Sequence, residues 1–192
     1  MPKGFTEQEK INITEKLITE CKVSWQKYGY KKTSIDDLCK NAGISKGAFY
    51  LFFQTKELLF METIKRVQKQ LYCIVENILL ENQNRDGMAK ALKEIYKEYS
   101  KSPFMYETTS VDFLSFFNKL SDEQQREINN DSYLGAKIML NKSYLKLKVS
   151  EELALSVLTS ILFTISQKDK MICEPQDAFN FIIDNLVEAI FE

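Results

Sequence analysis

The sequence predicts an all-α protein in which a small N-terminal domain of three helices precedes a larger helical domain, with about nine helices in total. Two observations support this fold class. The 192 residues include only three prolines and six glycines, a composition that favours long helices over a turn-rich β protein. Apolar residues also recur three and four positions apart along most of the chain, which is the spacing of one helix face.

The first predicted helix runs from Glu7 to Gly29. Thr6 and Glu9 can form a capping box, in which each side chain bonds a free backbone N–H of the first turn. The helix has one apolar stripe, which consists of Ile13, Leu17, Ile18, Cys21, Trp25 and Tyr28. This stripe indicates one buried face, and the single tryptophan belongs to it.

Two short helices and a tight turn are predicted between residues 34 and 53. Ser34 can cap the first helix, because a serine oxygen accepts N–H groups of a first turn. Gly43 can end it, since glycine tolerates the positive φ of a helix C-terminus. Ser45 can cap the second helix, which runs to Phe52, and Thr55 can cap a third. Two helices joined by a short turn containing glycine form the helix-turn-helix pattern.

Capped helices with a glycine turn occur in many all-α proteins, so this pattern is either an ordinary packing motif or a DNA-reading surface, and the exposed start of the second short helix has the chemistry of the latter. Its residues are small apart from Lys46, so the backbone can approach the major groove closely while one long donor reaches the bases. The Tyr50 hydroxyl and the N-termini of the neighbouring helices suit phosphate groups. The predicted DNA contacts are Thr33, Ser34, Ser45, Lys46, Gly47, Ala48, Tyr50 and Lys56.

Charge is unevenly distributed along a chain whose net charge is −1. Residues 1–60 contain ten Lys/Arg and seven Asp/Glu, hence +3, whereas residues 61–192 contain sixteen and twenty, hence −4. The basic excess accompanies the helix-turn-helix, as expected where the partner is a phosphate backbone. Lys31 and Lys32 precede the first short helix and are either phosphate contacts or ordinary solvated lysines.

This region resembles the DNA-binding domain of TetR-family transcriptional regulators. The resemblance covers about residues 6–60, and its matches stand at fixed spacing without a gap. They are Gly29-Tyr30, Thr33-Ser34, Ala42-Gly43-Ile44-Ser45-Lys46-Gly47, Phe49-Tyr50, Phe53 and Lys56-Glu57. Phe52 departs from the family pattern, which often has a polar or basic residue there. The resemblance implies a DNA-binding domain over residues 1–60 and an effector-binding and dimerisation domain over residues 61–192.

Five further helices are predicted in the second part of the chain. A long connector, from Lys56 to about Gln83, should carry movement from the second domain to the recognition helices. The others span residues 88–100, 122–147 with a break allowed near 129–132, 151–167 and 175–191. Caps at Ser121 and Ser150, and a proline at the first position of the last helix, mark three of the starts.

An aromatic segment, residues 104–117, is expected at the centre of the second domain. Aromatic rings with polar tips suit a mostly apolar ligand pocket, although each one alone is more simply explained as a core residue. The candidates are Tyr96, Tyr99, Phe104, Met105, Tyr106, Phe113, Phe116, Phe117, Tyr133 and Met139. Glu107 and Asp112 either select a cationic ligand or are exposed carboxylates.

The last two predicted helices are apolar on two sides, so they need two packing partners. We expect one side to pack on the parent chain and the other on a second copy, as a four-helix bundle around a two-fold axis. Burial in a larger monomer core is the alternative. The predicted interface residues are Leu155, Thr159, Phe163, Phe181 and Ala189. The resemblance agrees, because TetR-family proteins dimerise through their last helices.

No metal, cofactor or catalytic site is predicted. The chain has no histidine, and its four cysteines are widely spaced, so a zinc site would need thiolates from distant segments. Paired carboxylates, a nucleophile elbow and a phosphate-binding glycine loop are also missing from the sequence. The N-terminus lacks a signal-peptide apolar region, and the longest apolar stretch, residues 153–166, is too short to span a bilayer, so a cytoplasmic protein without membrane contact is expected.

The sequence therefore predicts a homodimeric, sequence-specific DNA-binding regulator. One short recognition helix reads too few bases, whereas two copies around a two-fold axis read a palindrome. Family precedent favours a repressor over an activator, and we expect its release from the operator by a small, largely apolar effector that changes the spacing of the two recognition helices. The alternative is a DNA-binding or interaction module regulated by a protein partner, with the aromatic segment as its docking surface.

Overall fold

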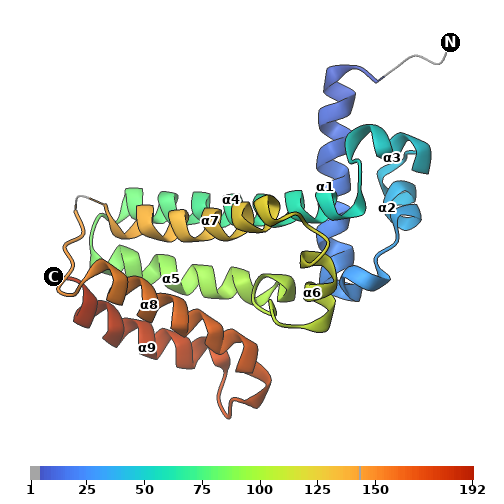
Figure 1. The fold of residues 1–192 in the computed structure, drawn as a ribbon. Helices are drawn as coiled ribbons and strands as arrows, with labels where there is room; N and C mark the ends of the chain where they lie inside the picture. The colour runs from blue at the N-terminus through green and yellow to red at the C-terminus, as the bar shows by residue number, and fades with distance from the viewer. Residues whose placement is uncertain (1–4, 143) are drawn as a thin grey trace. The chain divides into compact units, whose positions relative to one another are not determined.

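The computed structural model describes residues 5–142 and 144–192, which form nine α-helices and two 3-10 helices (Figure 1). The described residues contain one isolated β-bridge, between Leu147 and Phe191, and no longer strand. The predicted all-α fold class is therefore confirmed. None of the described helices is long and apolar enough to cross a membrane.

The chain divides into two compact units that are not continuous in sequence. The first comprises the residues up to Val67 together with Thr108–Ile128, and the second comprises Gln68–Glu107 and Asn129–Glu192. A segment of about twenty residues from the middle of the chain thus lies in the same unit as the predicted helix-turn-helix. Two helices, α4 (Lys56–Glu81) and α7 (Asp122–Leu140), have residues in both units.

The first unit is built mainly from four helices and the adjoining parts of α4 and α7. These helices are α1 (Glu7–Lys32), α2 (Ile35–Ala42), α3 (Lys46–Phe52) and α6 (Val111–Phe117). The predicted capping box is present, because Thr6 accepts from the Glu9 N–H and Glu9 accepts from the Thr6 N–H. Helix α1 packs against both α2 and α6.

Helix α1 continues one turn beyond the expected end at Gly29. The backbone leaves helical geometry at Gly29, where φ is 79°, and resumes it up to Lys32. The sequence-based boundary is thus a kink, which a glycine permits because it has no Cβ to clash at positive φ.

A cluster of aromatic rings forms part of the core of the first unit. The Trp25 ring lies 4.6 Å from Phe60 and 5.1 Å from Phe116, measured between centroids. Tyr30 adds edge-on contact with Phe60 at 5.0 Å. These separations are typical of favourable tilted and edge-to-face aromatic pairs. Helix α6 therefore supplies part of the core that supports the predicted DNA-binding helices.

The second unit is a layer of helices around a separate apolar core. Its elements are α5 (Arg85–Ser100), η1 (Pro103–Met105), α8 (Glu151–Leu162), η2 (Phe163–Lys170) and α9 (Pro175–Ile190), with parts of α4 and α7. Helices α5 and α9 pack side by side (Figure 1). The Tyr96 and Phe179 rings stack at 3.9 Å across this contact.

Three further helices differ in their bounds from the sequence-based prediction, and one of them, α5, starts at Arg85 instead of Met88. Helix α7 runs unbroken to Leu140, without the break allowed near residues 129–132 and short of the predicted end at Leu147. Helix α8 ends at Leu162, where an eight-residue 3-10 helix replaces its predicted last turn. Residues 146–148 instead pair with the end of the chain, through bonds such as Lys148 N–H to the Ile190 carbonyl at 2.8 Å.

Candidate nucleic-acid interface

The turn between α2 and α3 has the predicted local chemistry. The Ser34 hydroxyl accepts from the N–H groups of Asp36 and Asp37, and Ser45 accepts from the Ala48 N–H at 3.1 Å. Gly43 ends α2 at φ 76°, in the left-handed region. These caps satisfy free backbone donors and fix the angle at which α3 leaves the turn.

Helix α3 exposes a narrow row of small residues to solvent. Ser45, Lys46 and Gly47 are exposed, while Ala48 is half-buried and Phe49 anchors the helix in the core. A side chain at position 47 would meet only the Ser45 hydroxyl, 3.9 Å away. The absence of a side chain at Gly47 is therefore not required by the fold, and it leaves the helix backbone open to a close partner.

Farther along α3 the exposed side chains become larger. Tyr50 is 49% exposed and Leu51 is 76% exposed. Leu51 was not predicted from the sequence as part of this face, although its spacing of four from Gly47 places both on one side of a helix. Phe52, where the family pattern differs, is half-buried with its ring 5.5 Å from Phe5.

Lys46 is the main predicted base donor, and its ammonium pairs with Asp36 at 3.1 Å. This hydrogen bond raises the pKa of Lys46. Both side chains are more than half exposed, so the pair is weak and can be exchanged for a stronger anion. The Lys46 ammonium at the start of α3 is therefore paired with Asp36 of α2 only through a bond that a DNA group can replace.

Two of the predicted DNA contacts, Thr33 and Ser34, have side chains that are not exposed to a partner. Thr33 is 4% exposed, and its hydroxyl donates to the Gly29 carbonyl at 2.7 Å. The Thr33 side chain thus belongs to the core and cannot reach a phosphate as folded. Ser34 is half-buried, with its oxygen occupied by the cap of α2.

Lys56 is also engaged inside its own unit. Its ammonium donates to the Tyr30 carbonyl at 2.5 Å and lies 4.2 Å from the centre of the Tyr30 ring. Burial lowers the pKa of Lys56. The predicted phosphate contact would therefore require this bond to break first.

The structure adds a residue that sequence reasoning did not connect with the helix-turn-helix. The Asp112 carboxylate, at the start of α6, accepts from the Tyr30 N–H at 2.6 Å and the Lys31 N–H at 3.0 Å. It lies against the Gly29 kink, where an added Cβ would stand 2.8 Å from Asp112 Oδ2. Asp112 thereby fixes the chain just before α2, and its role is not that of an exposed carboxylate.

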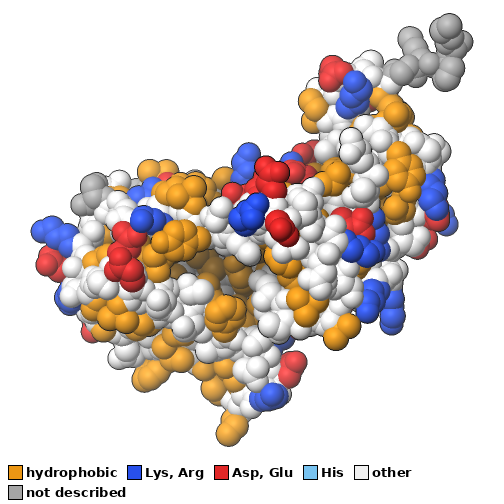
Figure 2. Space-filling model, in the orientation of Figure 1, with side chains coloured by type: hydrophobic (Ala, Val, Ile, Leu, Met, Phe, Trp, Pro, Cys, Tyr) orange, Lys and Arg blue, Asp and Glu red, His pale blue; other side chains and the backbone are white. Residues whose placement is uncertain are grey.

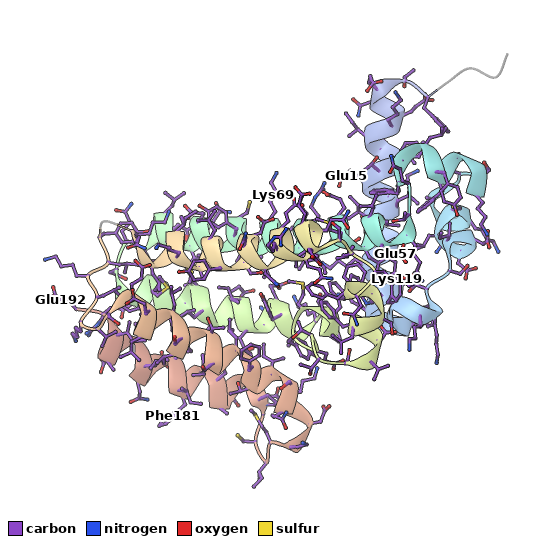
Figure 3. The ribbon with its side chains drawn as sticks, viewed as in Figure 1. Glu15, Glu57, Lys69, Lys119, Phe181 and Glu192 are labelled. Atoms are coloured by element: carbon purple, nitrogen blue, oxygen red, sulfur yellow. The ribbon has the colours of Figure 1, made fainter. Side chains whose placement is uncertain are left out.

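Glu57 and Lys119 extend this network (Figure 3). The Tyr30 hydroxyl donates to Glu57, and the Lys119 ammonium donates to Tyr30 Oη at 2.9 Å and to Glu57 at 3.3 Å. Burial raises the pKa of Glu57, but the hydrogen bonds from Tyr30 and Lys119 outweigh it and leave the pKa below its ordinary value. Lys119, which is more than 60 positions from either partner, therefore joins the end of α1 to the start of α4. Only the tertiary fold brings them into contact.

The predicted effector-pocket residues are divided between the two units. Phe113, Phe116 and Phe117 lie in the first unit, with Phe116 fully buried. The other seven lie in the second unit, namely Tyr96, Tyr99, Phe104, Met105, Tyr106, Tyr133 and Met139. Tyr133 is 57% exposed, whereas Tyr96, Tyr106 and Met139 belong to one buried cluster.

Four of the five predicted interface residues are exposed on the single chain. Phe181 is 73% and Phe163 is 56% exposed, and Thr159 and Ala189 are also exposed. Leu155 differs, because it is 9% exposed and packs in the core of its own unit. Figure 2 shows hydrophobic side chains protruding along the edge formed by α8, α9 and their connection, and Phe181 projects away from α9 in Figure 3.

The cysteines give no sign of a metal site within residues 5–142 and 144–192. Cys21 and Cys39 are buried, and Cys73 and Cys173 are exposed. Burial raises the pKa of the Cys21 thiol to about 12, so it stays protonated. No group of three metal-binding side chains was found among the described residues.

Comparison with known proteins identifies the N-terminal region. Residues 22–63 match the family described as bacterial regulatory proteins, tetR family. The chain is 33% identical to the uncharacterized HTH-type transcriptional regulator YuxN of Bacillus subtilis (strain 168), over 42% of this chain and 34% of YuxN. It is 40% identical to YhgD of the same organism over 30% of each protein. The chain thus matches about a third of the length of these curated relatives.

Solved structures resemble the chain over nearly its whole length. FadR from Bacillus subtilis, in complex with stearoyl-CoA, has a TM-score of 0.69 at 16% identity and covers 92% of this chain and 98% of its own. A TetR family transcription regulator from Marinobacter aquaeolei VT8 has a TM-score of 0.63 at 15% identity, over 97% and 100%. At these identities the likeness establishes the fold. The chain has a TetR-like all-α fold with an N-terminal helix-turn-helix, and the resemblance predicted from the sequence is confirmed.

Proposed function

We propose that this chain, with its TetR-type N-terminal domain, is a dimeric transcriptional regulator that reads DNA through α3. The observation that carries the proposal is the exposed Ser45-Lys46-Gly47 start of α3, capped by Ser45 and held by the Gly43 turn. A helix start of this kind can enter a major groove closely and offer one long donor. The relatives of the chain are transcriptional regulators and not enzymes, which supports a role in binding rather than catalysis.

The contacts divide into two kinds in this proposal. Lys46 donates to a base edge once it leaves Asp36, and Gly47 and Ala48 allow the backbone to come close. Ser45, Tyr50 and the α2 cap at Ser34 lie nearer the phosphates. Leu51 adds apolar surface that suits a thymine methyl group. The buried Thr33 side chain stabilises the backbone before α2 through its hydrogen bond to the Gly29 carbonyl.

A second copy would bind through the exposed apolar residues of α8 and α9. Large apolar side chains that protrude from two packed helices mark an interaction surface. A two-fold interface uses the same surface from both copies, and it would place two α3 helices on successive major grooves, about 34–36 Å apart. The matching operator is a palindrome.

Control by an effector is the remaining part of the proposal. The FadR neighbour has the same fold and was solved in complex with stearoyl-CoA, which supports a ligand site in a domain of this kind. A ligand that prefers one spacing of the two α3 helices would shift the protein between DNA-binding and free states. We propose that the effector releases the protein from its operator, so that the protein acts as a cytoplasmic repressor.

Selection of binding sites from random duplex DNA, at near-physiological salt, tests this function. The expected result is a palindromic consensus with half-sites one helical turn apart. Weak, steeply salt-dependent binding without a consensus would contradict sequence-specific recognition. In that case regulation by a protein partner that docks on the aromatic segment and copurifies with the chain would better explain the second unit.

A further inference from the structure

The core of the second unit contains two tyrosine hydroxyls without hydrogen-bond partners. Tyr96, on α5, is 2% exposed, and Tyr106, just after η1, is 6% exposed. Neither hydroxyl oxygen has a partner in the structure. Buried hydroxyls are nearly always hydrogen-bonded, and an unmade bond destabilises the fold. Two such groups in one core therefore point to a partner that the chain itself does not supply.

The neighbouring polar groups do not fill this role. The Thr164 hydroxyl lies close enough to lower the pKa of Tyr96, but it donates its proton to the Ile161 carbonyl at 2.7 Å and lies outside normal hydrogen-bond geometry with Tyr96. Burial raises the pKa of Tyr96. The phenol is therefore neutral and can donate its proton to an acceptor.

One cation stands beside the two phenols. The Lys168 ammonium lies 5.7 Å from the centre of the Tyr106 ring, and its charge also acts on Tyr96. Among the residues that the structure describes, no carboxylate pairs with Lys168 within ion-pair distance. Glu174 acts on Tyr96 in the opposite direction, but it is exposed.

The segment that carries Thr164 and Lys168 is unusual. It is the 3-10 helix η2, eight residues long, and it packs on α5. Runs of 3-10 helix beyond three or four residues are uncommon because their hydrogen bonds are poorer. Weaker hydrogen bonds make such a segment easier to shift than an α-helix, and its Thr164 and Lys168 both act on Tyr96 while Lys168 also approaches the Tyr106 ring.

We propose that Tyr96, Tyr106 and Lys168 bind the head group of an amphipathic monocarboxylate, which is the effector. Two phenol donors and one ammonium match the two oxygens of a carboxylate. The surrounding core is apolar and includes Ile161, Ile165 and Phe179, so the rest of the ligand is an apolar chain. Entry requires η2 to shift. This inference rests on the proposed function only in naming the ligand as an effector, since binding itself needs no DNA.

The direct test uses decanoate and decanol, which share a chain length and differ in head-group charge. Binding to the full-length protein is measured by calorimetry without DNA. Decanoate should bind at least tenfold more tightly than decanol. Tyr96→Phe with Tyr106→Phe should weaken decanoate at least tenfold, because hydrogen bonds to a charged group are lost, and should leave decanol unchanged. Lys168→Met should remove the preference, whereas Lys170→Met, two residues farther on in η2, should retain it.

A second measurement separates ligand binding from a structural role. Without ligand, the double Tyr→Phe variant should unfold at the same or a higher urea concentration, because it removes two unsatisfied polar groups. Tyr133→Phe, at an exposed position, is the control. Lower stability of the double variant, or equal binding of decanoate and decanol to the unmodified protein, would overturn the proposal. Either result would leave the DNA-binding function intact, because site selection from random DNA measures that function separately.

Discussion

The exposed faces of α3 and α9 differ in the chemistry that they offer to a partner. Helix α3 begins with Ser45, Lys46 and Gly47, which are small or cationic. Helix α9 exposes Phe181, which is 73% accessible, while other residues of the same helix are buried in the core of the second unit. Small residues and a flexible donor suit a polar groove that is read at close range, whereas an exposed phenylalanine gains most from burial against another apolar surface.

In the proposed dimer this difference gives the two faces separate roles. The α3 face is too small to select a site alone, since one recognition helix contacts only a few bases. The α8–α9 face supplies no sequence information but would double the contacts by pairing two copies. The α9 face should therefore control affinity through dimerisation, and the α3 face should control which sequence is bound.

The largest expected effect comes from Phe181→Asp. A buried interface aromatic is typically worth about 2–4 kcal/mol, and the substitution occurs twice in a two-fold dimer. We expect the dimer dissociation constant to rise by about 100-fold or more, as measured by sedimentation. Leu80→Asp replaces another exposed apolar residue of the second unit, 67% accessible, and should leave the dimer intact. Equal effects of both variants would contradict the assignment of the α9 face.

The second-largest effect is expected at the Gly29 kink, which lies just before α2. Gly29→Ala should lower the free energy of unfolding by about 2–4 kcal/mol, because φ is 79° and the new Cβ would meet Asp112 Oδ2 at 2.8 Å. Gly43→Ala has a similar φ of 76° but no atom within 4 Å, so it should cost only about 1–2 kcal/mol. Urea unfolding measures both.

Asp112→Ala sharpens this prediction. Combined with Gly29→Ala, it should cost less than the sum of the single changes, because removing the carboxylate also removes the atom with which the new Cβ clashes. Additive losses would show that Asp112 does not hold the Gly29 kink.

Lys46→Ala tests whether α3 carries sequence information. It should cost about 1–3 kcal/mol on the selected operator and relax the preference for one base. Lys40→Ala, which removes an exposed lysine from α2, should weaken specific and random DNA alike if it has any effect. Equal losses on both kinds of DNA for Lys46→Ala would remove Lys46 as the specificity residue.

Gly47→Ala separates stability from DNA binding. The fold has room for the methyl group, and alanine is a better helix former than glycine by up to about 1 kcal/mol. Thermal unfolding should therefore occur at the same or a slightly higher temperature. Operator binding should nevertheless weaken, because the methyl group would stand between the helix backbone and the groove. Unchanged operator affinity would show that α3 does not approach DNA closely at this position.

The smallest effect is expected from Asp36→Asn. It removes an exposed surface ion pair, which contributes little to stability, so the free energy of unfolding should hardly change. It also releases Lys46 and removes a negative charge from the DNA-facing side, so affinity should rise a few-fold at low salt. Asp37→Asn removes the neighbouring carboxylate without releasing Lys46, and it should give the smaller gain. Titrations at two salt concentrations compare them.

The local features of the helix-turn-helix could be predicted from the sequence because short-range chemistry decides them. A serine cap or a glycine at positive φ acts within four residues, and the structure has Ser34, Gly43, Ser45 and Thr55 in these roles. The apolar stripe of α1 likewise identified buried residues such as Leu17 and Trp25. In contrast, the 3-10 geometry of η2 had no sequence signal, since its residues 163–167 continue the apolar pattern of α8.

The chain alone therefore determined the fold class, the capped helix starts of the helix-turn-helix and the resemblance that carries the proposed function. Only the tertiary structure decided which side chains remain free to act. It buried Thr33 and Leu155, tied Lys56 to the Tyr30 carbonyl, and brought Asp112 to the Tyr30 N–H across 82 positions of sequence. The physical reason is that capping and periodicity are local, whereas exposure and long-range hydrogen bonds depend on which distant residues pack against each surface.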